Sequence, residues 1–160
     1  PLYSSAASDV YKRQADDRRE LKILSRKTNI PISGGESENT IFGCRSLIEE
    51  NAIQILQFDC TMFGGFTNGK KLAALCELNH VEVAPHHDCN IHAHLVASTP
   101  MGKTVESFDS IRDPLQSGLF ENPPEIKDGW IKLNDQPGLG LTVSDKCIKK
   151  IGKLVYKSKK

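Results

Sequence analysis

Four ionisable side chains in this 160-residue sequence have types that suit proton transfer, and they recur at similar intervals. An imidazole titrates near physiological pH, so a histidine can take up a proton and give it back. A carboxylate can serve as its partner or act as an acid or base itself. If the fold gathers these four side chains at one place, acid–base chemistry is the function they indicate. The residues are Glu36, Asp59, His86 and Glu106, which follow one another about 20 to 27 positions apart.

Each of the four residues lies at or just past the end of a short apolar run that we predict to be a strand. The run at 53–58 is rich in branched residues, as in a parallel strand covered on both faces. Segments of helical period separate the runs, and Asn39 or Thr40 is placed to cap the first of them. We expect strands at 30–33, 53–58, 81–84 and 103–107, and helices at 41–50, 68–79 and 90–98.

Alternation of strands and helices predicts an α/β fold with a parallel sheet. A (β/α)₈ barrel holds eight such units in roughly 250 residues, or about 30 residues per unit, which is close to the observed spacing. Side chains at the carboxyl ends of barrel strands converge on one mouth, so all four residues could share a site. Four strands cannot close a barrel of eight, so a barrel architecture predicts further βα units upstream of these four.

Each residue also has an ordinary structural explanation. Glu36 follows two glycines and could be a simple loop carboxylate. Asp59 could cap a helix or form a turn. His86 could be a loop histidine, and Glu106 could be a solvated strand end. Recurrence at four successive strand ends favours the functional interpretation over four independent coincidences.

Bulk composition narrows the classes of function. Twenty-one Lys and Arg against twenty Asp and Glu leave a net charge of +1, which offers no basic field for nucleic acid or an anionic membrane. No apolar run reaches about 18 residues, and no secretory leader pattern occurs, so we expect a cytoplasmic protein with a small-molecule partner. The five cysteines are never spaced as C-x-x-C, which indicates free buried thiols.

The first residues have an unusual sequence. Residues 4–14 read SSAASDVYKRQ, which matches one reading frame of a transposase adapter used in sequencing libraries. We therefore expect residues 1–14 not to be native. A reading frame that starts inside an adapter is truncated, so the native sequence would begin near Ala15 and lack its upstream part.

From Ala15 to about Ser144 the sequence resembles the mandelate racemase subgroup of the mandelate racemase/muconate lactonizing enzyme family, in the enolase superfamily. The resemblance implies a fold class, namely the C-terminal half of a (β/α)₈ barrel truncated at its N-terminus. Residues 15–108 would be the last four βα units, and residues 109–160 a return segment that packs on a missing capping domain. The matching segments are IPISGGE, ILQFDCTMFGG, VAPHHDCNIHAHLVASTP and TVESF.

The resemblance also implies roles. Glu36 would be the third carboxylate ligand of a Mg²⁺ ion, Asp59 the residue that orients the histidine, and His86 the general base or acid. Glu106 would hydrogen-bond as an acid to an enediolate oxygen. The metal would stabilise the charge that develops when the proton next to a carboxylate is removed. The first two metal ligands and the lysine opposite the histidine would lie upstream of Ala15. Phe58 stands where the family usually has proline.

Within the subgroup, an Asp–His pair excludes the branches that carry lysine on the strand of Asp59. The APHH and RDPL segments resemble sugar-acid dehydratases best, which implies β-elimination of water from an aldonic acid by a homo-oligomeric parent enzyme. A 2-hydroxy-acid racemase with the same residues is the nearest rival.

Two further hypotheses assign the chain to other functional classes, a zinc-binding module and a non-catalytic fragment. His86, His87, Asp88, Cys89, His92 and His94 crowd into nine positions, and imidazole and thiolate are zinc ligands. Against zinc, His92 and His94 lie two apart on a predicted helix and face different directions. The other hypothesis is a non-catalytic fragment that associates with other chains through an exposed sheet edge. For the 160 residues alone we expect no activity.

Overall fold

The computed structural model describes residues 17–153 and 155. The chain divides into two compact units, one ending at Glu106 and the other beginning at Ser107. The expected division into barrel units at 15–108 and a return segment at 109–160 stays a prediction. The adapter-like residues 1–14 lie outside the described residues.

The first unit is built on three parallel strands whose order in the sheet is their order in the chain. They are β1 (Ser33–Gly34), β2 (Ile55–Leu56) and β3 (Glu82–Val83), and Ile55 is in register with both Ser33 and Glu82. A helix stands between each strand and the next, so the predicted α/β fold with a parallel sheet is confirmed. The strands are shorter than the apolar runs that predicted them.

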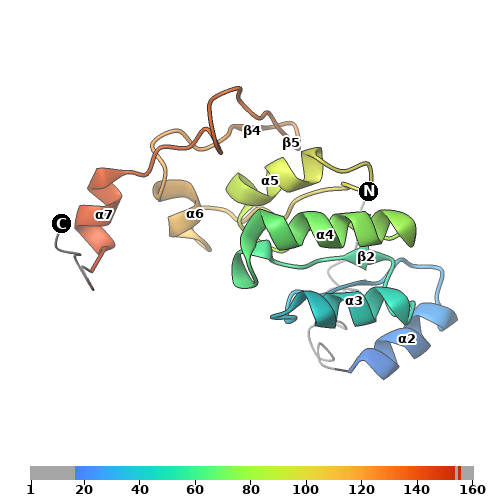
Figure 1. Ribbon diagram of the computed structural model, residues 1–160. Coiled ribbons are helices and arrows are strands. Elements are labelled where there is room, and N and C mark those ends of the chain that lie inside the picture. Colours follow the sequence, from blue (N-terminus) through green and yellow to red (C-terminus); the bar gives the residue numbers. More distant parts are fainter. Residues whose placement is uncertain (1–16, 154, 156–160) are drawn as a thin grey trace. The chain divides into compact units, whose positions relative to one another are not determined.

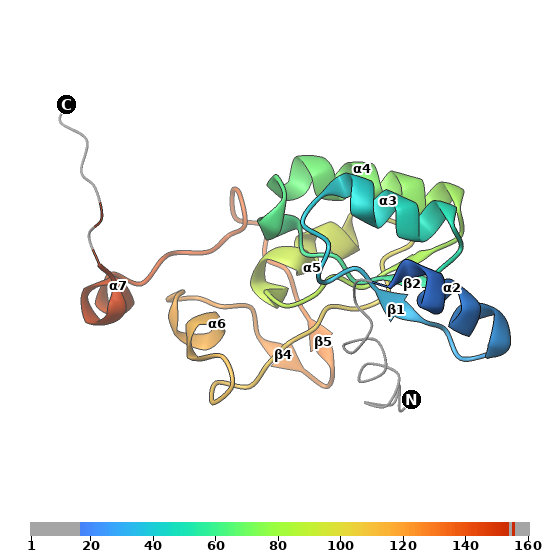
Figure 2. The same cartoon turned by 90° about the horizontal axis from the view of Figure 1, so that it is seen from below.

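The described residues of this unit form the helices α2 (Arg18–Lys27), α3 (Ile41–Glu49), α4 (Gly65–Leu78) and α5 (Cys89–Ala97). Helices α3 and α4 lie side by side along the strands (Figures 1 and 2), and α4 also contacts α5. Their apolar faces meet the strands in one core. Fully buried members of this core include Leu47, Leu56, Phe58, Val83 and Leu95.

Local sequence signals explain how these helices begin. The Thr40 hydroxyl accepts a hydrogen bond from the Gly43 N–H at 3.2 Å, so the second of the two expected caps is the one used. A short 3₁₀ helix, η1 (Cys60–Met62), precedes α4. The turn between them needs Gly64 and Gly65, whose φ angles are 105° and 66°. Helix α4 therefore begins three residues earlier than predicted.

The predicted strand at 103–107 is wrong in extent. Only Gly102 forms a bridge, parallel to Val83, with the Val83 N–H donating to the Met101 carbonyl and the Lys103 N–H donating to the Val83 carbonyl. Among the described residues this segment has a strand neighbour on one side only, and a ladder held on one side ends easily. Glu106 consequently lies in irregular chain.

Helix α2 was not predicted, and only Leu21, Ile23 and Leu24 of its ten residues are apolar. Leu21 is its single buried residue, and the Asp17 side chain caps it by accepting from the Glu20 N–H at 3.0 Å. Arg18 reaches across to Glu38 in the loop after β1, with an NH₂-to-carboxylate distance of 3.1 Å. Leu24, three positions after Leu21, also packs against the core, so a short apolar face, the cap and one ion pair together hold this helix.

The second unit has little regular structure. It contains α6 (Pro114–Gly118), an antiparallel pair formed by β4 (Ile126–Lys127) and β5 (Trp130–Ile131), and α7 (Asp145–Ile151). A further antiparallel bridge joins Phe120 to Val143. In the part of the chain that the structure describes, none of the helices is both long and apolar enough to cross a membrane.

Candidate functional site

Three of the four predicted site residues follow neighbouring strands at the same edge of the sheet. Glu36 comes after β1, Asp59 after β2 and His86 after β3. The backbone pairing continues up to this edge, because the His86 N–H donates to the Phe58 carbonyl at 3.0 Å. Parallel register therefore brings the residues after β2 and β3 to one level.

His86 faces two carboxylates. Its Nδ1 atom lies 2.7 Å from Oε2 of Glu106 and 3.3 Å from Oε2 of Glu36. Both Nδ1 of His86 and Oε2 of Glu36 are shielded from solvent, whereas the His86 side chain as a whole is 28% exposed. Solvent therefore reaches ring atoms other than Nδ1, and the edge of the ring that carries Nδ1 faces the protein interior.

These contacts raise the pKa of His86 above its ordinary value of 6.5. The hydrogen bond to Glu106 is the largest cause, because it favours the protonated ring. Burial acts in the opposite direction, and the negative charges of Glu106, Glu36 and Asp59 add to the increase. The site thus favours an imidazolium more than free histidine does.

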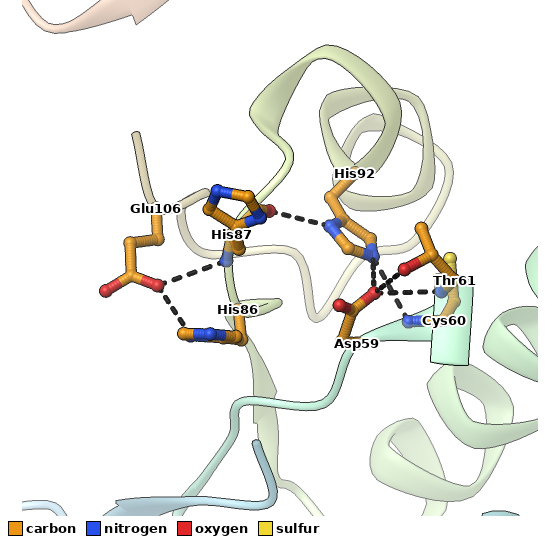
Figure 3. A network of polar contacts seen from close by, with 7 residues as sticks. All are labelled: Asp59, Cys60, Thr61, His86, His87, His92 and Glu106. Atoms are coloured by element: carbon orange, nitrogen blue, oxygen red, sulfur yellow. Dashed lines mark hydrogen bonds and ion pairs between the residues drawn. The ribbon is translucent and has the colours of Figure 1, made fainter. Parts of the chain in front are cut away.

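Glu106 also holds the backbone next to His86. Its Oε2 accepts a hydrogen bond from the His87 N–H at 3.1 Å in addition to the His86 contact (Figure 3). One carboxylate oxygen therefore fixes both the ring of His86 and the peptide that follows it. Although the strand predicted to carry Glu106 is missing, its side chain reaches the site.

Asp59 is buried at the same edge, but its contacts differ from those expected. Its Oδ1 accepts from the Thr61 N–H at 2.8 Å and from the Thr61 hydroxyl at 2.7 Å, so it caps η1. Among the described residues its other side-chain neighbour is His92, at 3.4 Å from Nε2 to Oδ1. No hydrogen bond joins Asp59 to His86 within this part of the chain. Asp59 acts on His86 through its charge, and Glu106 occupies the place next to the ring.

His92 is the residue that the sequence analysis did not recognise as part of the site. It lies on α5 and is completely buried, with Nδ1 2.8 Å from the His87 carbonyl and Nε2 3.2 Å from the Cys60 amide nitrogen. Its neighbours three positions away on the helix, Cys89 and Leu95, are buried too. That spacing was the available signal, since it puts the imidazole on the inner face of the helix.

The geometry of the site can be compared with the needs of zinc and of magnesium. Within the described residues, no group of three or more His, Cys, Asp or Glu side chains is arranged to hold a metal ion. Both ring nitrogens of His92 contact backbone atoms, so this histidine is not available to zinc. Glu36 fits a Mg²⁺ ligand, because its carboxylate is a hard oxygen donor with one shielded atom at a strand end. Since Mg²⁺ takes six oxygens, Glu36 would be only part of such a site.

The fold and the site together define a class. Consecutive parallel βα units place a histidine between carboxylates at the carboxyl edge of their sheet, as in the α/β barrel enzymes. A sequence profile described as "Enolase C-terminal domain-like" matches residues 13–147, and the chain belongs to that family.

Several relatives carry the names of sugar-acid dehydratases or of members of the D-galactonate dehydratase family. A D-galactonate dehydratase family member from Oceanicola granulosus is 32% identical over 134 residues, which cover 79% of this chain and 33% of the relative. A D-xylonate dehydratase from Haloferax volcanii is 29% identical over 127 residues, 76% of this chain and 31% of the relative. The chain thus spans about a third of the length of these relatives.

Solved structures show the same fold. The L-talarate dehydratase from Polaromonas sp. JS666, complexed with Mg and L-glucarate, superposes with a TM-score of 0.75 at 32% identity, covering 82% of this chain and 36% of that one. A mandelate racemase/muconate lactonizing enzyme from a marine actinobacterium, in complex with magnesium, gives a TM-score of 0.80 at 30% identity, covering 92% and 46%. The α/β barrel assignment is therefore confirmed.

Proposed function

We propose that this chain is the C-terminal part of the catalytic barrel of a sugar-acid dehydratase, which eliminates water from an aldonate. The observation that carries the proposal is the position of His86, whose Nδ1 lies between the carboxylates of Glu106 and Glu36 at the carboxyl edge of the sheet. The names of the relatives support the class of substrate and reaction.

The reaction has two bond-breaking steps. A base removes the proton from the carbon next to the carboxylate, and the electron pair left behind forms the enediolate. The bond from the neighbouring carbon to its hydroxyl then breaks, the hydroxyl takes up a proton and leaves as water, and the resulting enol becomes a 2-keto acid. An acid is needed where the hydroxyl leaves.

His86 is suited to be that acid. Glu106 and the surrounding negative charges raise its pKa, so the ring holds a proton that it can donate. Because Nδ1 is directed toward the carboxylates, the opposite ring nitrogen is the one that would meet a substrate. In this arrangement Glu106 orients His86, a role that the family resemblance had given to Asp59.

The proposal includes a magnesium ion. Glu36 would hold it together with carboxylates of the longer protein, and when bound it would stabilise the negative charge of the enediolate. The base that removes the first proton would also belong to the longer protein. We therefore expect no turnover by the 160 residues alone.

The test uses the complete coding sequence, with aldonates such as galactonate, mannonate and xylonate supplied with Mg²⁺. Formation of a 2-keto acid by the complete enzyme is expected, and His86→Asn should abolish it while Mg²⁺ affinity stays nearly unchanged. If His86→Asn instead removes metal binding, His86 belongs to the metal shell and the proposal is wrong.

A racemase would give a different result in the same assay. It would exchange the proton next to the carboxylate with solvent deuterium and invert that carbon, without forming a 2-keto acid. Such an outcome would replace the dehydratase proposal. Turnover by the 160-residue chain alone would overturn the expectation that the site is incomplete.

A further inference from the structure

The buried ring of His92 joins two loops that come from different strands. Its Nδ1 lies 2.8 Å from the carbonyl oxygen of His87, and its Nε2 lies 3.2 Å from the amide nitrogen of Cys60 (Figure 3). Cys60 directly follows Asp59, and His87 directly follows His86. A single side chain on α5 therefore connects the backbone next to one proposed site residue with the backbone next to another.

The partners determine where the proton of His92 lies. A carbonyl oxygen only accepts, so Nδ1 must carry the hydrogen and donate it to His87. A backbone N–H only donates, so Nε2 must present its lone pair to Cys60. The ring is therefore neutral and held in one tautomer.

The nearby carboxylate agrees with this assignment. Oδ1 of Asp59 is 3.4 Å from Nε2 of His92, but it accepts two shorter hydrogen bonds from Thr61. With a lone pair on Nε2, the Asp59 and His92 atoms are two acceptors, and no ion pair forms.

The loop after β3 needs such a partner. His87 and Asp88 have φ angles of 55° and 46°, a region that residues other than glycine disfavour. The peptide groups of His87 are fixed on both sides, because its N–H donates to Glu106 and its carbonyl accepts from His92. Strained backbone persists where surrounding contacts determine it.

We propose that His92 is a positioning residue that, as the neutral Nδ1–H tautomer, clamps the loop after β2 to the loop after β3. The clamp fixes the position of the loop backbone from which His86 and Asp59 project. Its importance for catalysis rests on the proposed function. The two hydrogen bonds of His92 do not depend on that function.

Nuclear magnetic resonance of the ¹⁵N-labelled 160-residue chain tests the clamp directly. The expected result is the nitrogen shift pattern of a neutral Nδ1–H imidazole, together with a coupling through the hydrogen bond between the Cys60 amide nitrogen and Nε2 of His92. An imidazolium pattern, which would indicate an ion pair with Asp59, overturns the proposal. So does the absence of that coupling.

Two substitutions separate the halves of the clamp. In His92→Asn the amide nitrogen can replace Nδ1 and keep the His87 contact, whereas in His92→Gln the amide oxygen can replace Nε2 and keep the Cys60 contact. We expect amide exchange at Cys60 to accelerate at least tenfold in His92→Asn and to change much less in His92→Gln. His94→Asn, two positions along the same helix, is the matched control and should leave Cys60 unchanged.

A positioning role also predicts an effect at His86. The Nδ1 signal of His86, which lies next to Glu106, should shift or broaden in His92→Gln, which loses the His87 contact, while the apolar core signals stay in place. An unchanged His86 signal in a folded His92→Gln variant would reduce His92 to a packing residue and overturn the proposal. If the complete enzyme lacks dehydratase activity but the Cys60 coupling is present, the proposed function fails and the clamp remains.

Discussion

Glu106 and His86 are joined by a 2.7 Å contact between Oε2 and Nδ1, and the same oxygen accepts the His87 N–H. The carboxylate therefore controls the ring and the adjacent backbone at once. A carboxylate this close to the ring favours the protonated, positively charged form of the histidine.

Glu106→Gln should lower the pKa of His86 toward its ordinary value of 6.5, because it removes the principal cause of the increase. The measurement is a titration of the His86 ring signals in the chain without added divalent metal. Glu49→Gln is the control, since Glu49 is solvent-exposed and pairs with Arg45 on α3. A His86 pKa that is the same in both variants would mean that Glu106 does not act on the ring.

The same shift has a consequence for stability. A histidine whose pKa is raised in the folded state contributes stability that is fully present below its unfolded pKa of about 6.5 and is lost as the pH rises through the folded value. Urea unfolding of the wild type and Glu106→Gln should therefore differ more at pH 5.5 than at pH 9. A difference that does not depend on pH would assign the effect of Glu106 to packing alone.

Asp59 has two separable roles, capping and charge. Asp59→Ala removes the acceptor for both Thr61 hydrogen bonds and should destabilise the fold by about 1 kcal/mol, which is typical of a lost cap. Asp59→Asn keeps an oxygen acceptor and should cost less, yet it removes the charge that contributes to the His86 pKa. Urea midpoints and the His86 titration distinguish the two. Equal destabilisation by Ala and Asn would show that the charge, rather than the cap, stabilises this turn.

The sequence predicted the parts of the fold that depend on local pattern. Apolar runs at 53–58 and 81–84 contain β2 and β3, and helical period located α3 and α5 within a residue or two. Because parallel units repeat, the position of a residue after a strand was enough to bring Glu36 and His86 to one edge. The chemistry of the candidate site followed from residue types at those positions.

What the sequence did not predict depends on contacts between distant segments. The path of 103–107 is set by a single bridge to Val83, and the choice of Glu106 rather than Asp59 as the partner of the His86 ring depends on that path. Asp59 was expected to orient His86 but is held by Thr61, a residue only two positions away, whose hydroxyl competes effectively as a local partner.

Gly102 should not tolerate a larger residue. A Cβ atom at this position would lie 2.1 Å from the Val96 carbonyl oxygen, which is backbone and cannot swing aside. Gly102→Ala should therefore destabilise the chain by about 1–3 kcal/mol, as overpacking does, and should disturb the approach of Glu106. Gly118→Ala is the control, because an added Cβ there meets nothing within 4 Å. Similar urea midpoints for the two variants would contradict the close approach of Gly102 to α5.

The cysteines give a prediction that needs no knowledge of the substrate. Burial raises the pKa of Cys44 and Cys76 from 9.0 to about 12, and Cys60 and Cys89 are also buried, whereas Cys147 is partly exposed. Since the thiolate is the reactive form, a thiol reagent at pH 8 should modify Cys147 first, and Cys147→Ser should remove this fast phase. Rapid modification of several thiols in the Cys147→Ser variant would contradict a closed core.

Alkaline pH should then weaken the fold through the same buried thiols. Unfolded cysteines lose their protons near pH 9, while Cys44 and Cys76 keep theirs until about pH 12 in the folded chain, so the folded state binds more protons in this window. The free energy of unfolding should fall as the pH rises from 9 toward 12. Replacing Cys44 and Cys76 with alanine removes two titrating groups and should flatten that decline, although the smaller side chains lower stability at every pH. Urea unfolding at pH 8, 9.5 and 11 measures the slope, and equal slopes in the wild type and the double variant would show that other groups control alkaline unfolding.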